Sequence, residues 1–145
     1  MRVESLGVIF KKVSEQKNKK DKIEILQKHD HQGLRIMLEL LLDDNIKWAL
    51  PEGPLPYTPN KQLDCEGQLY TELRRMYLFV EGGHPTLQQR KRELLFIQLL
   101  EAVTPADAEL LLAMKDHKAP KLYGINKKLV DEFKQGGTVK QEAHG

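Results

Sequence analysis

Cysteine is nearly absent from this sequence: Cys65 is the only one among 145 residues. A single thiol excludes a disulfide framework within the chain and a zinc site built from cysteines. Chains without disulfides are typical of reducing compartments. We therefore expect a cytoplasmic location.

Long hydrophobic runs are also missing. The mean hydropathy is −0.52, and no apolar stretch approaches the roughly 18 residues that a membrane span needs. The N-terminal stretch MRVESLGVIFKKVSEQKNKK is basic, but it contains no apolar run that ends in small residues. The sequence therefore predicts no signal peptide and no membrane partner.

Motifs of catalysis are absent as well. The sequence contains neither a GxxxxGK[ST] phosphate loop nor a GxGxxG dinucleotide fingerprint. Cys65 lies between Asp64 and Glu66, whose charges disfavour the thiolate that a cysteine nucleophile needs. The acidic pairs Asp43–Asp44 and Asp131–Glu132 are adjacent, so their side chains diverge on a helix. We therefore predict that the protein is not an enzyme.

The histidines do not form a metal-binding pattern either. His29 and His31 are two residues apart, which points them to different sides of a helix. No cysteine or acidic companion stands at metal-ligand spacing from them. The sequence predicts no metal site and no cofactor.

Charge is abundant: 23 Lys and Arg residues oppose 21 Asp and Glu residues, which leaves a net charge of +2. Many of the cations gather in three clusters: Lys11, Lys12, Lys17, Lys19, Lys20 and Lys22; Arg90, Lys91 and Arg92; and Lys115, Lys118, Lys121, Lys127 and Lys128. Each cluster alone is also typical of a solvated helix end. Convergence of the clusters on one face would instead indicate a surface for a polyanion.

Apolar residues recur at helical spacing along most of the chain. In the N-terminal part, helices are predicted over residues 6–13, from a cap at Asn18 to His29, and after a cap at Asp30. A fourth helix covers residues 66–80 and is ended by Gly82 and Gly83, and a largely buried central helix follows with Pro85 in its first turn. The next helix is capped by Thr104 with Pro105 at its first position, and a last helix follows a loop over residues 115–123. No strand alternation is present. The sequence predicts a single compact all-α domain of six to seven helices over residues 1–134, with a flexible polar tail at 135–145.

A proline-rich stretch interrupts this helical pattern. Residues 51–59, PEGPLPYTP, contain four prolines, each of which lacks an N–H and forces the residue before it into an extended conformation. We interpret the stretch as a stiff surface connection within one domain.

The last predicted helix begins with an unusual concentration of positive charge. In LYGINKKLVDEF, Asn126 is the expected cap, with Ile125 and Val130 as a hydrophobic staple around it. Lys127 and Lys128 then add cations where the helix dipole is already positive. An anion at this position would explain them, and Gly124 would leave space for a phosphate to approach.

The C-terminal half, EGGHPTLQQRKRELLFIQLLEAVTPADAELLLAMKDHKAPKLYGINKKLVDEF, resembles the helical DNA-binding domain that precedes the catalytic core of ATP-dependent DNA ligases. The resemblance implies an all-α module that grips duplex DNA, including nicked duplex, across the minor groove without reading sequence. The DNA-binding residues it implies, with the nearby basic positions, are Gly82, Gly83, Lys91, Lys118, Lys121, Gly124, Asn126, Lys127 and Lys128.

The sequence departs from the ligase pattern in two respects. Leu122 occupies a position where ligases often have a cation. The nucleotidyl-transfer motif KxDG is absent, so the chain cannot seal a nick by itself. A second segment, WALPEGP…LYTELRRMYLFVEGG, looks like a small uncharacterised protein family of T-even-like phages and cyanophages, which would make the location a host cytoplasm.

Two main hypotheses follow. The first is a non-enzymatic phage protein that binds the phosphate backbone of duplex DNA in replication, repair or host takeover. The second is a protein-interaction module that kept the ligase-like fold and binds a phage or host replication or transcription protein. A structural virion component is a third option that no residue favours. Whether the basic clusters share one face discriminates between the first two.

Overall fold

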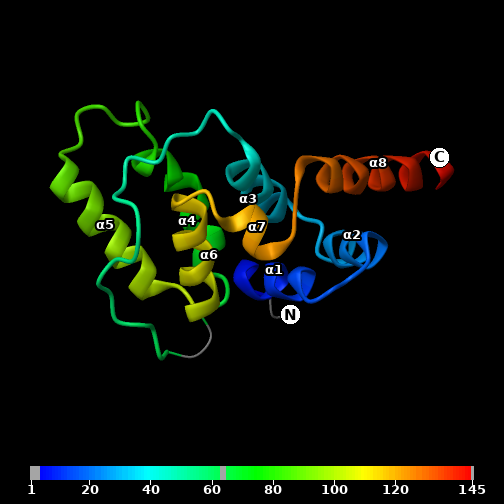
Figure 1. The fold of residues 1–145 in the computed structure, drawn as a ribbon, viewed down its shortest axis with the longest axis horizontal. Coiled ribbons are helices and arrows are strands. Elements are labelled where there is room, and N and C mark those ends of the chain that lie inside the picture. The colour runs from blue at the N-terminus through cyan, green and yellow to red at the C-terminus, as the bar shows by residue number, and fades with distance from the viewer. Residues whose placement is uncertain (1–3, 63–64, 145) are drawn as a thin grey trace.

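The computed structural model describes residues 4–62 and 65–144, and within these ranges the chain forms eight α-helices, one 3-10 helix and no strand (Figure 1). The helices are α1 (Leu6–Ser14), α2 (Lys19–Lys28), α3 (Gln32–Leu42), α4 (Gln68–Glu72), η1 (Leu73–Phe79), α5 (Gln89–Ala102), α6 (Pro105–Lys115), α7 (Ala119–Tyr123) and α8 (Lys127–His144). The prediction of an all-α domain is confirmed.

The centre of the fold is α6, which buries apolar side chains around most of its circumference, including Ala108, Leu110, Leu111 and Met114. Its main packing partner is α1. The two helices approach so closely that a Cβ on Gly7 would lie 2.3 Å from the carbonyl carbon of Ala106. Glycine is therefore required at this contact, because backbone atoms cannot move aside as a side chain can.

The helix over residues 89–102 is peripheral, although its apolar sequence predicted burial on most sides. In Figure 1 α5 lies along one edge of the molecule. It buries Phe96, Leu99 and Leu100 on one face, whereas Leu94 remains 48% exposed. The apolar run predicted too much burial, because a helix can pack at the edge of a domain with only one of its faces covered.

Two predicted helix starts are confirmed. Thr104 caps α6 by accepting a hydrogen bond from the Asp107 N–H at 3.1 Å, with Pro105 at the first helical position. Asn126 caps α8, since its Oδ1 accepts from the Leu129 N–H at 2.8 Å. Ile125 and Val130 are both buried, as the predicted staple requires.

Other helix limits differ from the prediction. His31 caps α3 in place of Asp30, because its Nδ1 accepts from the Leu34 N–H at 3.1 Å. Asp30 instead holds Arg35 through two hydrogen bonds of 2.7 and 2.8 Å. Pro85 lies in the turn before α5, which begins only at Gln89. Residues 66–80 form the short α4 followed by η1, and α7 lies within the predicted loop.

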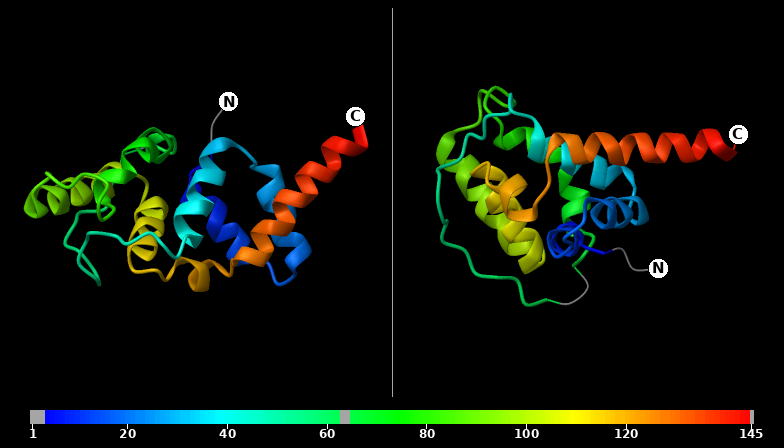
Figure 2. Two further views of the ribbon diagram at one scale, coloured as in Figure 1. Left: turned by 90° about the horizontal axis from the view of Figure 1, so that it is seen from above. Right: turned by 45° about the vertical axis from the view of Figure 1, so that its right-hand side comes forward.

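The last helix continues past the predicted domain limit at Lys134. α8 extends through Gly136 and Gly137 to His144, and Figure 2 shows its second half projecting from the body. Gly145, the end of the predicted tail, lies outside the described residues.

The proline-rich connection is tied to α6 by Lys115. The Lys115 side chain is fully buried, and its ammonium donates to the carbonyl oxygens of Pro51 and Gly53, each at 2.8 Å. It also pairs with Asp116 at 2.7 Å. Lys115 is therefore a structural clamp and does not add its charge to the exposed cations of the third basic cluster.

No helix among the described residues is long and apolar enough to cross a bilayer.

Candidate nucleic-acid interface

The turn that joins α7 to α8 is built around Gly124. This residue ends α7 in the left-handed conformation, with φ 65° and ψ 40°, which strongly favours glycine. Its carbonyl oxygen accepts a hydrogen bond from the Lys22 ammonium at 2.7 Å. A Cβ here would lie 2.6 Å from that nitrogen. The space expected for a phosphate beside Gly124 is therefore occupied by a cation from α2.

This hydrogen bond brings the first basic cluster to the third. Lys22 and Gly124 are 102 residues apart in the chain. Helix α2 packs along α8, and Lys19 forms an ion pair with Glu132. Lys19, Lys22 and the buried Leu26 follow the spacing i, i+3, i+7, which places them on one face of α2. Figure 2 shows α2 beside α8.

Lys127 and Lys128 point to different sides of α8, as adjacent helical residues must. Lys127 faces α3 and pairs with Asp44 at 2.7 Å. Both side chains are exposed, and the pair raises the pKa of Lys127 and lowers that of Asp44. Lys128 lies one turn before Glu132, on the α2 side, and is exposed.

On α7, Lys118 and Lys121 are exposed on the surface that leads into the Gly124 turn. Lys118, Lys121 and Lys128 have no acidic partner among the residues that the structure describes. We call Lys22, Lys118, Lys121 and Lys128 the junction lysines, since α2, α7 and α8 meet there.

The other predicted site residues lie elsewhere. Gly82, Gly83 and Lys91 belong to the turn before α5 and to its first helical turn, at the end of the molecule opposite α2 and α8 (Figures 1 and 2). Gly82 has φ +82°, and a Cβ on Gly83 would lie 2.0 Å from the Tyr77 carbonyl oxygen. Both glycines are therefore explained by the turn itself, and these three residues are not part of the junction.

Arg92 is buried and belongs to the same distant region. Its guanidinium donates to the carbonyls of Leu78 and His84 at 2.8 and 3.0 Å, and to Gln89 at 2.6 Å. This arginine holds the turn before α5 together. The second basic cluster therefore supplies only Arg90 and Lys91 as exposed cations.

The residue that sequence reasoning left out of the site is Lys22. It was recognised as part of a basic cluster, but its proximity to Gly124 depends on the packing of α2 against α8. The signal available in the sequence was the 19, 22, 26 spacing, which placed two lysines on the same side of a short helix as the buried Leu26.

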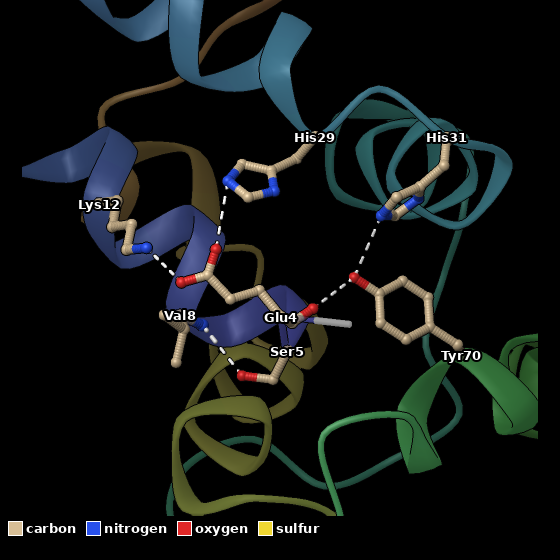
Figure 3. A network of polar contacts seen from close by, with 7 residues as sticks. All are labelled: Glu4, Ser5, Val8, Lys12, His29, His31 and Tyr70. Atoms are coloured by element: carbon tan, nitrogen blue, oxygen red, sulfur yellow. Dashed lines mark hydrogen bonds and ion pairs between the residues drawn. The ribbon is translucent and has the colours of Figure 1, made fainter. Parts of the chain in front are cut away.

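The histidines have structural roles in a polar network (Figure 3). Glu4 accepts from Lys12 and lies 3.2 Å from His29 Nε2 through its other oxygen. The Tyr70 hydroxyl donates to the Glu4 carbonyl at 2.7 Å and lies 3.3 Å from His31 Nε2. Because His31 Nδ1 accepts the α3 cap hydrogen bond, its Nε2 carries the proton and donates to Tyr70.

The network therefore connects neighbouring helices and has a structural role. Within it, burial is the main reason that the pKa of His29 is lowered, and the nearby Glu4 carboxylate only partly offsets this lowering. Within the described ranges, no group of three or more His, Cys, Asp or Glu side chains could hold a metal ion. Asp64, the acid expected beside Cys65, lies outside those ranges.

The fold and the junction define a small all-α protein with a lysine-lined surface where three helices meet. The chain belongs to a family of unknown function (DUF6433), whose model matches residues 9–121. That range covers α1 to most of α7. No curated protein and no solved structure matches the chain.

Proposed function

We propose that the protein binds the phosphate backbone of duplex DNA through the junction lysines, without reading base sequence. The observation that supports this most is the hydrogen bond from Lys22 to the Gly124 carbonyl, because it brings together two basic clusters from opposite ends of the chain. Cations from α2, from α7 with its N-cap and from α8 then lie near one turn of the chain, the turn around Gly124. Phosphate contacts of this kind release counterions and drive non-specific association.

The charge balance around the junction supports the same proposal. The three exposed junction lysines lack acidic partners in the described part of the chain, whereas Lys19 and Lys127 already have one each. A surface selected only for solubility has no need to concentrate unpaired cations beside a helix N-terminus. The role is non-enzymatic, and the resemblance to ligase domains and to phage proteins favours replication, repair or host takeover in a host cytoplasm.

The test compares two double charge reversals of equal size. Lys121→Glu/Lys128→Glu changes the junction, and Arg90→Glu/Lys91→Glu changes exposed residues at the opposite end. In a fluorescence-anisotropy titration with a short duplex at low salt, we expect the junction variant to bind at least about ten-fold more weakly and the distal variant to stay within about three-fold of wild type. An equal loss in both variants would show a general charge effect and contradict the proposal.

A second candidate is supported by the groove between α3 and α8. This cavity of about 350 Å³ is lined by Leu38, Leu42 and Val130, with charged residues of both signs at its edges. An apolar floor with a charged rim suits a segment of a partner protein. The second candidate predicts no binding of duplex even at low salt, together with a photo-crosslink from position 131 to one partner that Leu42→Glu abolishes.

A further inference from the structure

Leu122 is the most exposed large hydrophobic residue among those described, at 57% of its surface, ahead of Tyr77 at 52% and Leu94 at 48%. Its exposure follows from the geometry of α7. Ala119 and Tyr123 are four residues apart and buried, so they form the inner face of this short helix. Leu122 lies at the edge of the outer face, about 80° around the helix axis from the middle of the inner face, and is exposed.

The cations of α7 share that outer face. Lys118, Lys121 and Leu122 follow the spacing i, i+3, i+4, and all three are exposed. Two residues further along, Lys22 holds the Gly124 carbonyl at 2.7 Å. Leu122 is thus an apolar side chain within a group of ammonium groups.

Among the described residues, Leu122 is not one of the partly buried hydrophobics that pack against the core. Full burial of a leucine side chain is worth about 1.5–3 kcal/mol, and a side chain that is 57% exposed forgoes much of this. A lysine or an alanine would serve the helix equally well. The arrangement suits a ligand that is anionic outside and apolar inside, which describes duplex DNA when its base pairs are opened at a bend.

We propose that Leu122 is a wedge that enters the minor groove and separates neighbouring base pairs, while Lys118 and Lys121 hold the flanking phosphates. This inference rests on the proposed function. It makes the protein selective for DNA steps that unstack easily, since the cost of opening them is smaller. Leu122 would then set which DNA structures are bound, and the lysines would set the overall affinity.

The experiment uses two duplexes of equal length, one fully paired and one with a central T·T mismatch, each with 2-aminopurine beside the centre. We expect wild type to bind the mismatched duplex about five-fold more tightly and to increase the fluorescence of its 2-aminopurine. Leu122→Ala should bind both duplexes with similar affinity and produce no increase. Leu122→Phe should retain the preference, because an aromatic ring can also act as a wedge.

Leu94→Ala is the matched control, because Leu94 is similarly exposed but lies on α5, at the far end of the molecule (Figure 1). It should behave as wild type. If wild type and Leu122→Ala bind both duplexes equally and without a fluorescence change, the wedge is refuted while the proposed function stands. If no duplex is bound at low salt, the proposed function itself fails.

An anionic membrane surface is the other ligand that combines negative charge with an apolar interior. Vesicles of phosphatidylcholine with phosphatidylserine therefore form a second arm of the experiment. We expect Leu122→Ala to leave vesicle co-sedimentation unchanged. A loss of vesicle binding in Leu122→Ala, with DNA binding unaffected, would assign the leucine to lipid and overturn the inference.

Discussion

Asp107 shows at the residue scale how a single carboxyl group joins two helices. Its side chain is fully buried, and Oδ1 accepts from the Gly7 N–H of α1 at 2.6 Å. Oδ2 has no hydrogen-bond partner in the part of the chain that the structure describes. Burial raises the pKa of Asp107 to about 6, although hydrogen bonds from Gly7 and Thr104 act in the opposite direction.

This raised pKa predicts a pH-dependent stability. Because the pKa of Asp107 is higher in the folded protein than in the unfolded chain, protonation of this carboxyl group stabilises the fold. This contribution to the free energy of unfolding is fully present below about pH 4 and is lost as the pH rises through 6. Asp107→Asn keeps an acceptor for Gly7 and removes the titration. We expect the variant to gain about 2–3 kcal/mol relative to wild type between pH 4 and pH 7, measured as the free energy of unfolding in urea.

The comparison between the two proteins isolates Asp107 from other groups. His29, whose pKa is lowered mainly by burial, stabilises the fold above its ordinary pKa and loses this contribution as pH falls. That effect is common to wild type and Asp107→Asn and cancels in the difference. Parallel stability curves over pH 4 to 7 would show that the buried carboxyl does not titrate in this range.

At the scale of elements, Lys115 connects α6 to a segment that has few hydrogen bonds of its own. The connection also donates two backbone hydrogen bonds, from the Gly53 N–H to Asp116 at 3.3 Å and from the Thr58 N–H to Glu101 at 2.8 Å. Among these side chains only that of Lys115 is fully buried. Its removal takes the donor away from the carbonyl oxygens of Pro51 and Gly53, in contacts that are partly buried.

We therefore expect Lys115→Met to lower the free energy of unfolding by about 2–4 kcal/mol. Lys118→Met, three residues further along and exposed, should change it by less than about 0.5 kcal/mol. Chemical denaturation of the two variants measures both values. Equal stability in the two proteins would mean that the connection does not depend on the clamp.

The features that were predicted correctly from the sequence are those that depend on residues close together in the chain. Thr104 and Asn126 were found because a cap acts within three residues of its own position. The His31 cap was missed because Asp30 is the better cap by propensity, yet Asp30 forms two hydrogen bonds with Arg35. Residues 119–123 were assigned to a loop, since a one-turn helix acquires its stability from the core around it.

The candidate site was predicted only in part for a similar reason. Lys121, Gly124, Asn126 and Lys128 lie close together in the chain, so their grouping was visible. The approach of Lys22 is a tertiary contact over 102 residues, which spacing cannot reveal. Lys91 illustrates the converse limit, because a basic cluster in sequence carries no information on which end of the molecule it occupies.

At the scale of the whole molecule, a net charge of +2 conceals two separate basic regions. In Figure 1 α5, which begins with the exposed Arg90 and Lys91, lies along one edge of the molecule, whereas α7 lies near the middle and α2 and α8 lie toward the other end. One duplex held at the junction would therefore neutralise only the local cations. The size of that group sets how strongly salt weakens binding.

We predict that the logarithm of the association constant falls with the logarithm of the salt concentration with a slope of about −3 to −4, as expected for about four phosphate contacts. Anisotropy titrations over a series of salt concentrations measure it. The distal variant Arg90→Glu/Lys91→Glu should keep this slope, and Lys121→Glu/Lys128→Glu should flatten it by about two. A slope steeper than about −6 would mean that both basic regions engage DNA together.

The contact between α1 and α6 also determines how the chain can fold during its synthesis. The Gly7–Asp107 hydrogen bond joins residues 100 positions apart, so α1 meets its main packing partner only after about 100 further residues have been translated. Until then Ile9 and Phe10 have no core to enter. Apolar surface exposed in this way during synthesis is prone to aggregation, which is the situation that chaperones counteract.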